Sequence, residues 1–335
     1  SMLGTTIVWT TDNADIISVD GVVTPVEGER NAVKLTATIT KGDQTDEIDI
    51  TVLVGELPVL TIEDALAITT KDVIKVKGTV VGYVANDTLA FHDETGAFTL
   101  FVGGQTLGEA ATILRGAIGK VVIVEGSRNT YNGLEQIEKI LSAEVVATET
   151  PHFEKADITD VDWDPTTLLP YQGKLISITE GVISKVTIDS DDNITVEITI
   201  GEKTINMKWD ARVAITGGTN RLLTALEGDL IDVVDAPLGW VSNKPLIGYY
   251  VANQAVITEN PNLEKYEVTF MDGENVIDTI EVTDGRIIPA EEYPRVIKPG
   301  FKLSGWFTDE ELLTAWDPAT VIEADTVLYA KFEEA

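Results

Sequence analysis

Apolar and polar residues alternate in short runs along most of the chain, and glycine, aspartate and asparagine separate the runs. Residues 34–40 read KLTATIT and residues 47–54 read EIDITVLV. Alternation with a period of two places the apolar side chains on one face of a β-strand. Few segments have the 3.6-residue period of an amphipathic helix. The pattern therefore predicts a mainly β chain built from short strands.

The segment between residues 57 and 150 predicts three strands, a helix and two further strands. The expected strands lie in residues 74–85, 88–94, 98–104 and 120–146, and the expected helix lies in residues 109–117. Before them, Thr61 and Asp64 have the spacing of a reciprocal helix cap. This element order is that of the OB-fold, a small five-stranded barrel. The segment resembles the OB-like modules of bacterial extracellular proteins, which often stand beside nucleases or phosphatases.

The same order recurs between residues 151 and 260, with a helix expected in residues 220–228. Gly181 in TEGVIS corresponds to Gly78 in VKGTVV, about one hundred residues earlier. A period of that length indicates a duplicated domain, because it exceeds the length of solenoid repeats. Residues 150–172 are acidic and punctuated by proline, so we interpret them as a linker or lead-in.

A different pattern occupies the first 56 residues. A tryptophan-threonine-threonine stretch is followed by ISVDGVV, by LTATITKG and by a closing alternating strand. This resembles the short, atrophied form of the bacterial immunoglobulin-like domain. The positions that carry the resemblance are Trp9, Ile17, Ser18, Val19, Asp20, Gly21, Val23, Leu35, Ala37 and Gly42. We expect the first strand of the family to be clipped here and interpret Ser1-Met2 as a cloning remnant, which predicts a fragment of a longer protein.

The pattern changes again at Lys265. Tyr266, Val268 and Phe270 alternate in KYEVTF, GFKLSGWFTD follows, and TVLYAKF closes the segment. This resembles the Listeria–Bacteroides repeat, the B-repeat of internalins, and implies a β-grasp-like domain on a bacterial surface. The matching positions are Tyr266, Val268, Phe270, Gly285, Pro299, Gly300, Phe301, Gly305, Trp306, Phe307, Asp309, Trp316, Asp317, Leu328, Tyr329, Ala330 and Phe332. MDGEN replaces the usual turn of the first hairpin. We expect Phe301, Trp306 and Trp316 to form the core of this small domain.

These observations predict four small modules in tandem. They are a truncated bacterial Ig-like sandwich (1–56), two OB-like five-stranded barrels (57–150 and 151–260) and a β-grasp-like B-repeat (261–335).

Composition narrows the function classes. The net charge is −32, and each of the four segments is acidic. Nucleic acid is therefore a poor partner, because its binding requires lysine and arginine to displace phosphate counterions. No apolar run is long enough to insert into a membrane. The chain has no cysteine, which excludes disulfides and agrees with export in many Gram-positive bacteria. Together with the resemblances, this predicts a bacterial extracellular or cell-surface location.

Ligand-binding candidates follow from the way OB-folds bind, through aromatic side chains near strands two and three and through neighbouring basic residues. Such residues also pack in cores, so the candidates remain alternatives to structural roles. They are Phe91, Phe101, Arg128, Tyr131, Trp240 and Tyr249. A host or matrix protein and a glycan are the candidate partners.

The sequence offers no catalytic motif and no cofactor motif. His92 stands beside Asp93 and Glu94, so a general base is conceivable, but we interpret His92 as a polar residue at the end of a strand on a barrel rim. Asp160, Asp162 and Asp164 have the alternate spacing of a calcium loop. The twelfth position from Asp160 is Tyr171, where such a loop has glutamate, so a solvated acidic turn is the competing interpretation.

We therefore expect a non-catalytic extracellular region of a bacterial surface protein, serving as spacer, adhesion or ligand-binding modules. The alternative is an accessory substrate-binding region of a larger extracellular enzyme, such as a nuclease or phosphoesterase, that binds nucleic acid or carbohydrate. A catalytic role for this chain is not expected.

Overall fold

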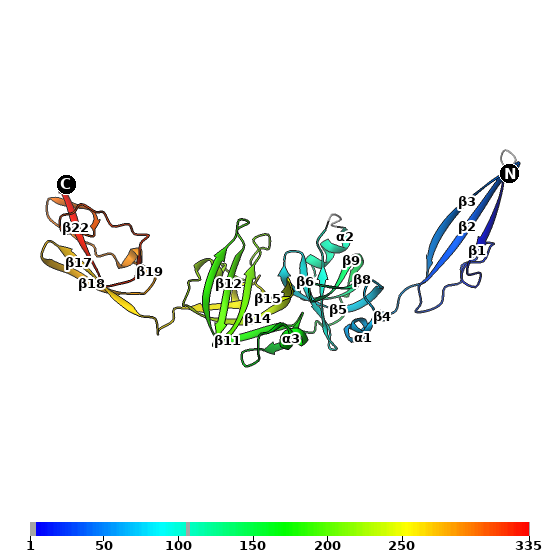
Figure 1. Cartoon of the computed structure of the whole chain (residues 1–335), viewed down its shortest axis with the longest axis horizontal. Helices are drawn as coiled ribbons and strands as arrows, with labels where there is room; N and C mark the ends of the chain where they lie inside the picture. Colours follow the sequence, from blue (N-terminus) through cyan, green and yellow to red (C-terminus); the bar gives the residue numbers. More distant parts are fainter. Residues whose placement is uncertain (1–4, 105–107, 335) are drawn as a thin grey trace. The chain divides into compact units, whose positions relative to one another are not determined.

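The computed structural model describes residues 5–104 and 108–334 (Figure 1). Strands dominate these residues, so the prediction of a mainly β chain built from small modules is confirmed. The chain divides into two compact units, residues 1–258 and residues 259–335. None of the helices in the described residues is long and apolar enough to cross a membrane.

The first module is an antiparallel sheet in the order β1-β2-β3, formed by Thr5–Thr11, Asn31–Lys41 and Gln44–Val54. The register places the apolar residues of the three strands on one face. Ile16 and Ile17, from the β1–β2 loop, pack with Val33 and Val54 against that face. Among the described residues a loop therefore supplies the second layer, where the sequence predicted the second sheet of a sandwich.

The second module is a barrel, which we call barrel 1. Its elements are β4 (Val59–Leu60), α1 (Ile62–Ala67), β5 (Val73–Ala85), β6 (Thr88–His92), β7 (Ala97–Phe101), α2 (Glu109–Arg115), β8 (Lys120–Tyr131) and β9 (Leu134–Val145). The sheet order is β4-β5-β6-β7-β9-β8, and pairing of β5 with β8 closes the barrel. The predicted cap of α1 is present, because the Thr61 hydroxyl accepts from the Asp64 backbone N–H and donates to its carboxylate.

The third module, barrel 2, has the same strand order, and β11–β14 pairing closes it. Its elements are β10 (Lys155–Asp157), α3 (Pro165–Leu168), η2 (Leu169–Tyr171), β11 (Leu175–Ile188), β12 (Ile194–Ile200), β13 (Lys203–Trp209), η3 (Arg221–Thr224), β14 (Leu230–Val241), β15 (Lys244–Gly248), η4 (Ala252–Gln254) and β16 (Ala255–Thr258). The helix expected in residues 220–228 is only the 3₁₀ turn η3. Asn220 caps this turn, and Gly228, with a φ of +89° in the left-handed region, lies beyond it.

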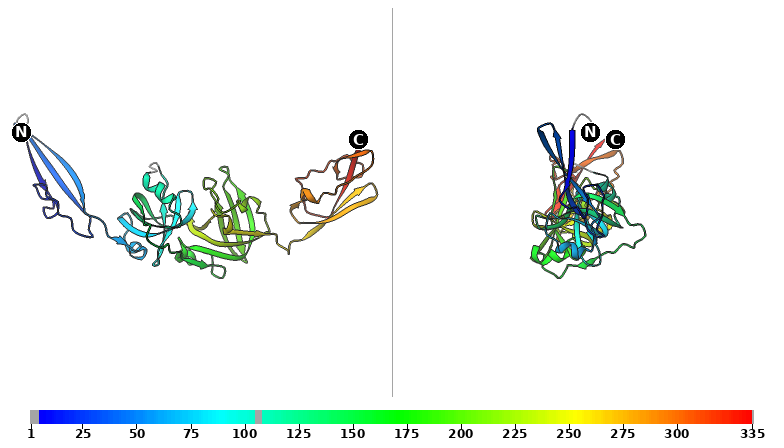
Figure 2. Two further views of the ribbon diagram at one scale, coloured as in Figure 1. Left: turned by 180° about the vertical axis from the view of Figure 1, so that it is seen from behind. Right: turned by 90° about the vertical axis from the view of Figure 1, so that its right-hand side faces the viewer.

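The last module forms the second compact unit (Figure 2). Its elements are β17 (Lys265–Asp272), β18 (Asn275–Thr283), β19 (Arg286–Ile287), η5 (Ala290–Glu292), β20 (Phe301–Phe307), β21 (Val321–Ile322) and β22 (Thr326–Glu334). The main sheet has the order β18-β17-β22-β20, with β17 and β22 parallel.

Aromatic side chains fill the core of this module. The rings of Phe270 and Trp306 meet edge to face with centroids 4.7 Å apart, and the Trp316 indole donates a 2.8 Å hydrogen bond to the Tyr293 hydroxyl. Trp306 is buried and Trp316 packs against the core. The core prediction is wrong for Phe301, which is 44% exposed at the start of β20.

Candidate functional site at the junction of the two barrels

The outer face of strands β6 and β7 in barrel 1 is the surface through which OB-folds bind oligonucleotides and oligosaccharides. In this chain the same face is covered by other residues of the chain. Ala90 clusters with Val81, Val84 and Leu175, the first residue of β11. The backbone of His152 and Glu154 lies within 3.1 Å of the His92 imidazole. The segment that leads into barrel 2 thus occupies the usual ligand face of barrel 1.

Tyr250 of barrel 2 reaches furthest into barrel 1. Its hydroxyl donates a 2.6 Å hydrogen bond to the Val81 carbonyl, and its ring meets the Tyr83 ring edge to face at 5.9 Å. A Cβ atom on Gly82 would lie 2.1 Å from the Tyr250 hydroxyl oxygen, so only glycine leaves room for this contact. Burial raises the pKa of Tyr250 to about 12, which keeps the hydroxyl protonated as a donor.

Two glycines of barrel 2 allow the same close approach from the other side. A Cβ atom on Gly239 would lie 2.2 Å from a methyl group of Val84, and a Cβ atom on Gly248 would lie 2.1 Å from the Tyr83 carbonyl oxygen. Strand β5 of barrel 1 therefore rests directly on strands β14 and β15 of barrel 2. Contacts this close fix the two barrels against each other.

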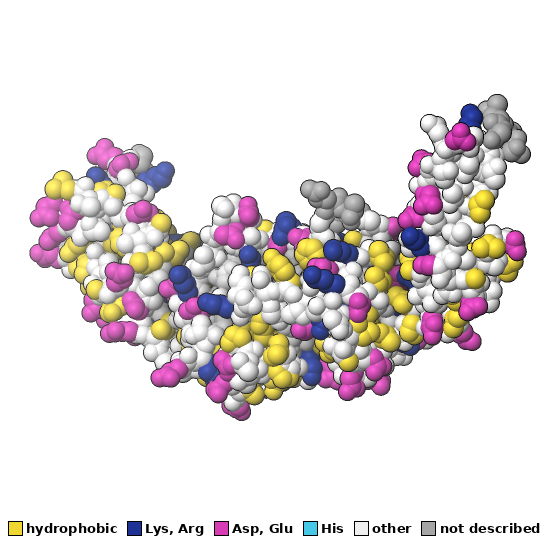
Figure 3. All heavy atoms as spheres, turned by 45° about the vertical axis from the view of Figure 1, so that its right-hand side comes forward, with side chains coloured by type: hydrophobic (Ala, Val, Ile, Leu, Met, Phe, Trp, Pro, Cys, Tyr) yellow, Lys and Arg dark blue, Asp and Glu magenta, His cyan; other side chains and the backbone are white. Residues whose placement is uncertain are grey.

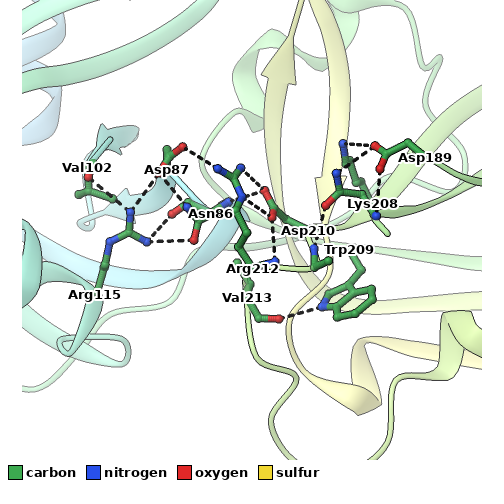
Figure 4. Close-up of polar contacts among 12 residues, drawn as sticks. Asn86, Asp87, Val102, Arg115, Asp189, Lys208, Trp209, Asp210, Arg212 and Val213 are labelled. Atoms are coloured by element: carbon green, nitrogen blue, oxygen red, sulfur yellow. Dashed lines mark hydrogen bonds and ion pairs between the residues drawn. The ribbon is translucent and has the colours of Figure 1, made fainter. Parts of the chain in front are cut away.

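A polar network continues the junction beyond the glycines (Figure 4). The β5–β6 turn of barrel 1 presents Asn86 and Asp87, and Arg115 from α2 donates to both. The Asn86 backbone N–H donates to the Asp210 carboxylate of barrel 2 at 3.2 Å. Arg212 binds Asp210 through two nitrogens, at 2.8 and 2.9 Å, and its remaining nitrogen lies 3.5 Å from Asp87.

The charges of this network are matched. Burial alone would raise the pKa of Asp210, but hydrogen bonds from Arg212 and from the Asn86 backbone outweigh burial and lower it. The same ion pair raises the pKa of Arg212. Asp210 and Arg212 thus stay charged, and they join turns of two barrels rather than leaving charge free for a ligand.

The second loop that OB-folds use for binding is also engaged. In barrel 1 this is the β8–β9 turn, where the Asn132 carbonyl accepts a 3.1 Å hydrogen bond from the Asn243 backbone N–H of barrel 2. The Gln172 side chain accepts from the Glu135 N–H at 2.6 Å and donates to the Gly133 carbonyl at 2.8 Å.

The chain's two histidines, sixty residues apart in sequence, are neighbours at this junction. The rings of His92 and His152 are 6.0 Å apart, and His92 is fully buried on strand β6. Burial lowers the pKa of His92 to about 4. The neutral imidazole can then accept the 3.1 Å hydrogen bond from the Glu154 N–H. The local sequence around each histidine does not indicate this pairing, because the two residues are sixty positions apart.

The sequence-predicted ligand residues separate into two groups. Phe91 lies in the core of barrel 1, and Trp240 and Tyr249 lie in the core of barrel 2. Arg128 is buried over the Phe98 ring and paired with Glu135. These four side chains are corrected to structural roles, because a buried side chain cannot stack on a ligand. Phe101 is half-buried and Tyr131 is 61% exposed, so binding at these two positions stays a prediction.

Of the three aspartates proposed for calcium, Asp164 makes local hydrogen bonds. Asp164 caps α3, and the Thr167 hydroxyl and backbone N–H groups lower its pKa. Among residues 5–104 and 108–334, no three His, Cys, Asp or Glu side chains lie close enough together to hold a metal ion. Asp160 and Asp162 therefore join no such group with Asp164.

The equivalent face of barrel 2 is open. Its outward residues on β12 and β13 are polar and at least partly exposed, and they pair as Thr195 with Lys208, Glu197 with Asn206, and Thr199 with Thr204. Barrel 1 has Ala90 and His92 on the corresponding strand, and these are buried. The difference in residue type agrees with one face being docked and the other being solvated.

Comparisons with known families identify the two end modules. Residues 1–57 match the atrophied bacterial Ig domain, and residues 266–331 match the Listeria-Bacteroides repeat domain. The chain thus carries both modules that the sequence resemblance suggested. Such modules typically occur in extracellular bacterial proteins and fit a non-catalytic region of a surface protein.

No curated protein matches the chain. Among solved structures, the Ifi202 HINa domain in complex with 20-bp dsDNA is 14% identical, covers 57% of this chain and 97% of its own, and has a TM-score of 0.24. The p204 HINb domain is 12% identical, with coverages of 56% and 97% and a TM-score of 0.25. A replication protein A heterotrimer bound to ssDNA is 10% identical, with coverages of 68% and 81% and a TM-score of 0.20. Scores this low say nothing about what this chain binds.

Proposed function

We propose that this chain is a non-catalytic, extracellular part of a bacterial surface protein, in which the two barrels act together as one stiff spacer. The observation that carries the proposal is the docking of barrel 2 onto the ligand face of barrel 1. Gly82, Gly239 and Gly248 bring the backbones into contact, and Tyr250 bonds across the junction. A surface buried in this internal contact fixes the distance between the two barrels and is not accessible to ligands.

The two flanking modules support the location, since both belong to families typical of extracellular bacterial proteins. The absence of cysteine suits the same setting. No catalytic constellation is needed for a spacer, and the buried, neutral His92 serves the junction.

Spin-label distances test the stiffness directly, because a chain without cysteine accepts two unique labels. Leu141 of barrel 1 and Leu223 of barrel 2 are both at least 60% exposed, so cysteines placed there carry labels without disturbing the core. A narrow distance distribution, as narrow as that of the control pair Ile188 and Leu223 within barrel 2, is expected. A broad distribution for the inter-barrel pair alone would contradict a stiff spacer.

A second candidate is an accessory binding region of an extracellular enzyme, and the open face of barrel 2 favours it. The half-exposed hydroxyl, amide and charged groups of Thr195, Glu197, Asn206 and Lys208 suit a polar ligand such as a glycan. A glycan panel and a single-stranded DNA titration at low and physiological salt distinguish the ligand classes. If neither experiment detects binding, the spacer role is the only one of the two proposals that stands.

A further inference from the structure

The Listeria–Bacteroides repeat contains a hollow of about 380 Å³, within the size range of small-ligand pockets. We call it the Phe301 pocket. Phe301 and Phe332 line it with aromatic rings, and Asp272, Glu310 and Lys298 line it with charged groups. All belong to the second compact unit, so this one module builds the pocket.

Lys298 shows which chemistry the walls favour. Its ammonium lies 4.5 Å from the centroid of the Phe332 ring and 6.0 Å from that of Phe301. The same ammonium makes hydrogen bonds of 2.9 and 3.1 Å to the Asp272 carboxylate. An aromatic face and a carboxylate acting together are the usual recognition elements for an organic cation. Lys298 thus already uses half of the pocket in this way.

The second carboxylate of the lining is available. Glu310 makes no hydrogen bond or ion pair to any of the residues that the structure describes. Phe301 keeps 44% of its side chain exposed. A second cation can therefore meet a carboxylate and aromatic rings without displacing Lys298.

Exposed apolar residues follow or precede the charged and aromatic lining of the Phe301 pocket in the sequence. Ile297 and Leu313 are next in sequence to the lining residues Lys298 and Leu312, and they are 92% and 82% exposed. Leu313 is held in place, because the Asp309 carboxylate accepts from the backbone N–H groups of Leu313 and Thr314 at 2.8 and 2.6 Å. These two side chains offer apolar surface close in sequence to the pocket lining.

The net negative charge of the module favours a positively charged partner. Between residues 261 and 335 there are seventeen aspartates and glutamates against six lysines and arginines. Acidic side chains spread over the visible surface of this module in Figure 3. Such a field attracts basic surfaces and repels acidic ones.

We propose that the Phe301 pocket binds an arginine or lysine side chain of a basic protein partner, with apolar neighbours of that side chain resting on Ile297 and Leu313. The cation pairs with Glu310 and stacks on Phe301. This gives the repeat a binding activity in addition to the spacer role. It does not depend on that role, because the inter-barrel distances stay the same whether or not the pocket binds.

The test uses the full chain and two capped tripeptides, one with arginine between two leucines and one with citrulline in place of arginine. Citrulline keeps the shape of arginine and removes its charge. Amide chemical shifts of the repeat are followed during each titration. We expect saturable shifts at the backbone of residues 310–313 and 329, with the arginine peptide binding about tenfold tighter than the citrulline peptide.

Two charge-neutralising variants distinguish binding by the pocket carboxylate from attraction by the net negative charge of the module. Glu310→Gln is expected to weaken the arginine peptide about tenfold, to the level of citrulline. Glu323→Gln makes the same change of net charge at an exposed position outside the pocket and is expected to leave binding unchanged. Ile297→Ser combined with Leu313→Ser is expected to weaken both peptides alike. Equal binding of the two peptides, or equal losses in Glu310→Gln and Glu323→Gln, would overturn the proposal.

Discussion

The hydroxyl of Tyr250 donates a 2.6 Å hydrogen bond to the carbonyl oxygen of Val81, which lies 169 residues earlier in the chain. The bond is buried and joins the last part of barrel 2 to the first long strand of barrel 1. It is the single contact that best distinguishes a docked pair of barrels from two barrels on a linker.

Tyr250→Phe tests this bond. The variant removes the donor and leaves the Val81 carbonyl buried without a partner, so the free energy of unfolding should fall by about 1–3 kcal/mol. Urea denaturation measures it. Tyr131→Phe removes a hydroxyl that is exposed to solvent and should leave the midpoint unchanged. An equal effect of the two variants would show that the bond contributes nothing.

Gly248→Ala tests the close approach of the backbones. The added methyl would lie 2.1 Å from the Tyr83 carbonyl oxygen, which is backbone and cannot swing away. We expect a loss of about 1–3 kcal/mol and a broader inter-barrel distance distribution. Gly116→Ala adds the same methyl where the nearest atoms lie at an ordinary contact distance of 3.6 Å and the φ of −86° suits alanine, so it should not lower the stability. A distribution that stays narrow in Gly248→Ala would argue against the backbone contact.

The buried His92 side chain should make the free energy of unfolding depend on pH. Its pKa is lowered by burial to about 4, from the ordinary value near 6.5, so the unfolded chain binds the proton more readily than the folded chain. The stabilisation associated with neutral His92 is complete above pH 6.5 and is lost as the pH falls from 6.5 towards 4. The full difference is about 3 kcal/mol.

The check is the difference between the wild-type chain and His92→Gln. Carboxylates titrate in both proteins, so subtracting the two curves isolates the histidine. Urea midpoints between pH 4 and 8 should show a shallower slope for His92→Gln. Parallel curves would mean that His92 takes up its proton without disturbing the fold.

Trp306→Ala should unfold the repeat and leave the barrels intact. Trp306 packs edge to face on Phe270 in a small core, and losing such a side chain costs about 3–5 kcal/mol. Amide spectra should lose the dispersed signals of residues 265–334 while those of the barrels persist. Phe301→Ala is the control, because that side chain is 44% exposed and its loss should leave the module folded.

The strands were predictable because each depends on alternation within a few residues, as in residues 34–40 and 47–54. The repeat was predictable because Trp306 and Trp316 stand in a characteristic spacing. The junction was not predictable in the same way. His92 and Ala90 occupy outward positions on β6, and only the docking of residues from barrel 2 buries them.

Candidate ligand residues failed for a related reason. Phe91 and His92 are adjacent on one strand, so one points into the barrel and the other away from it, and composition cannot say which. Trp240 and Tyr249 are both aromatic residues in strand segments, which suits a binding surface and a core equally well. Whether such a side chain lies in the core or on the surface depends on barrel closure, which requires pairing of strands far apart in sequence, such as β11 with β14.

Strand β3 of the first module ends its sheet, and its open side faces solvent over most of Gln44–Val54. A bare strand edge of this length invites pairing with a neighbouring molecule. The edge carries Asp46, Glu47 and Asp49, and Asp46 stands opposite Ile39 on the otherwise apolar face. Another chain adding a strand here would have to bury these carboxylates. Addition of a strand from another molecule is therefore disfavoured at the β3 edge.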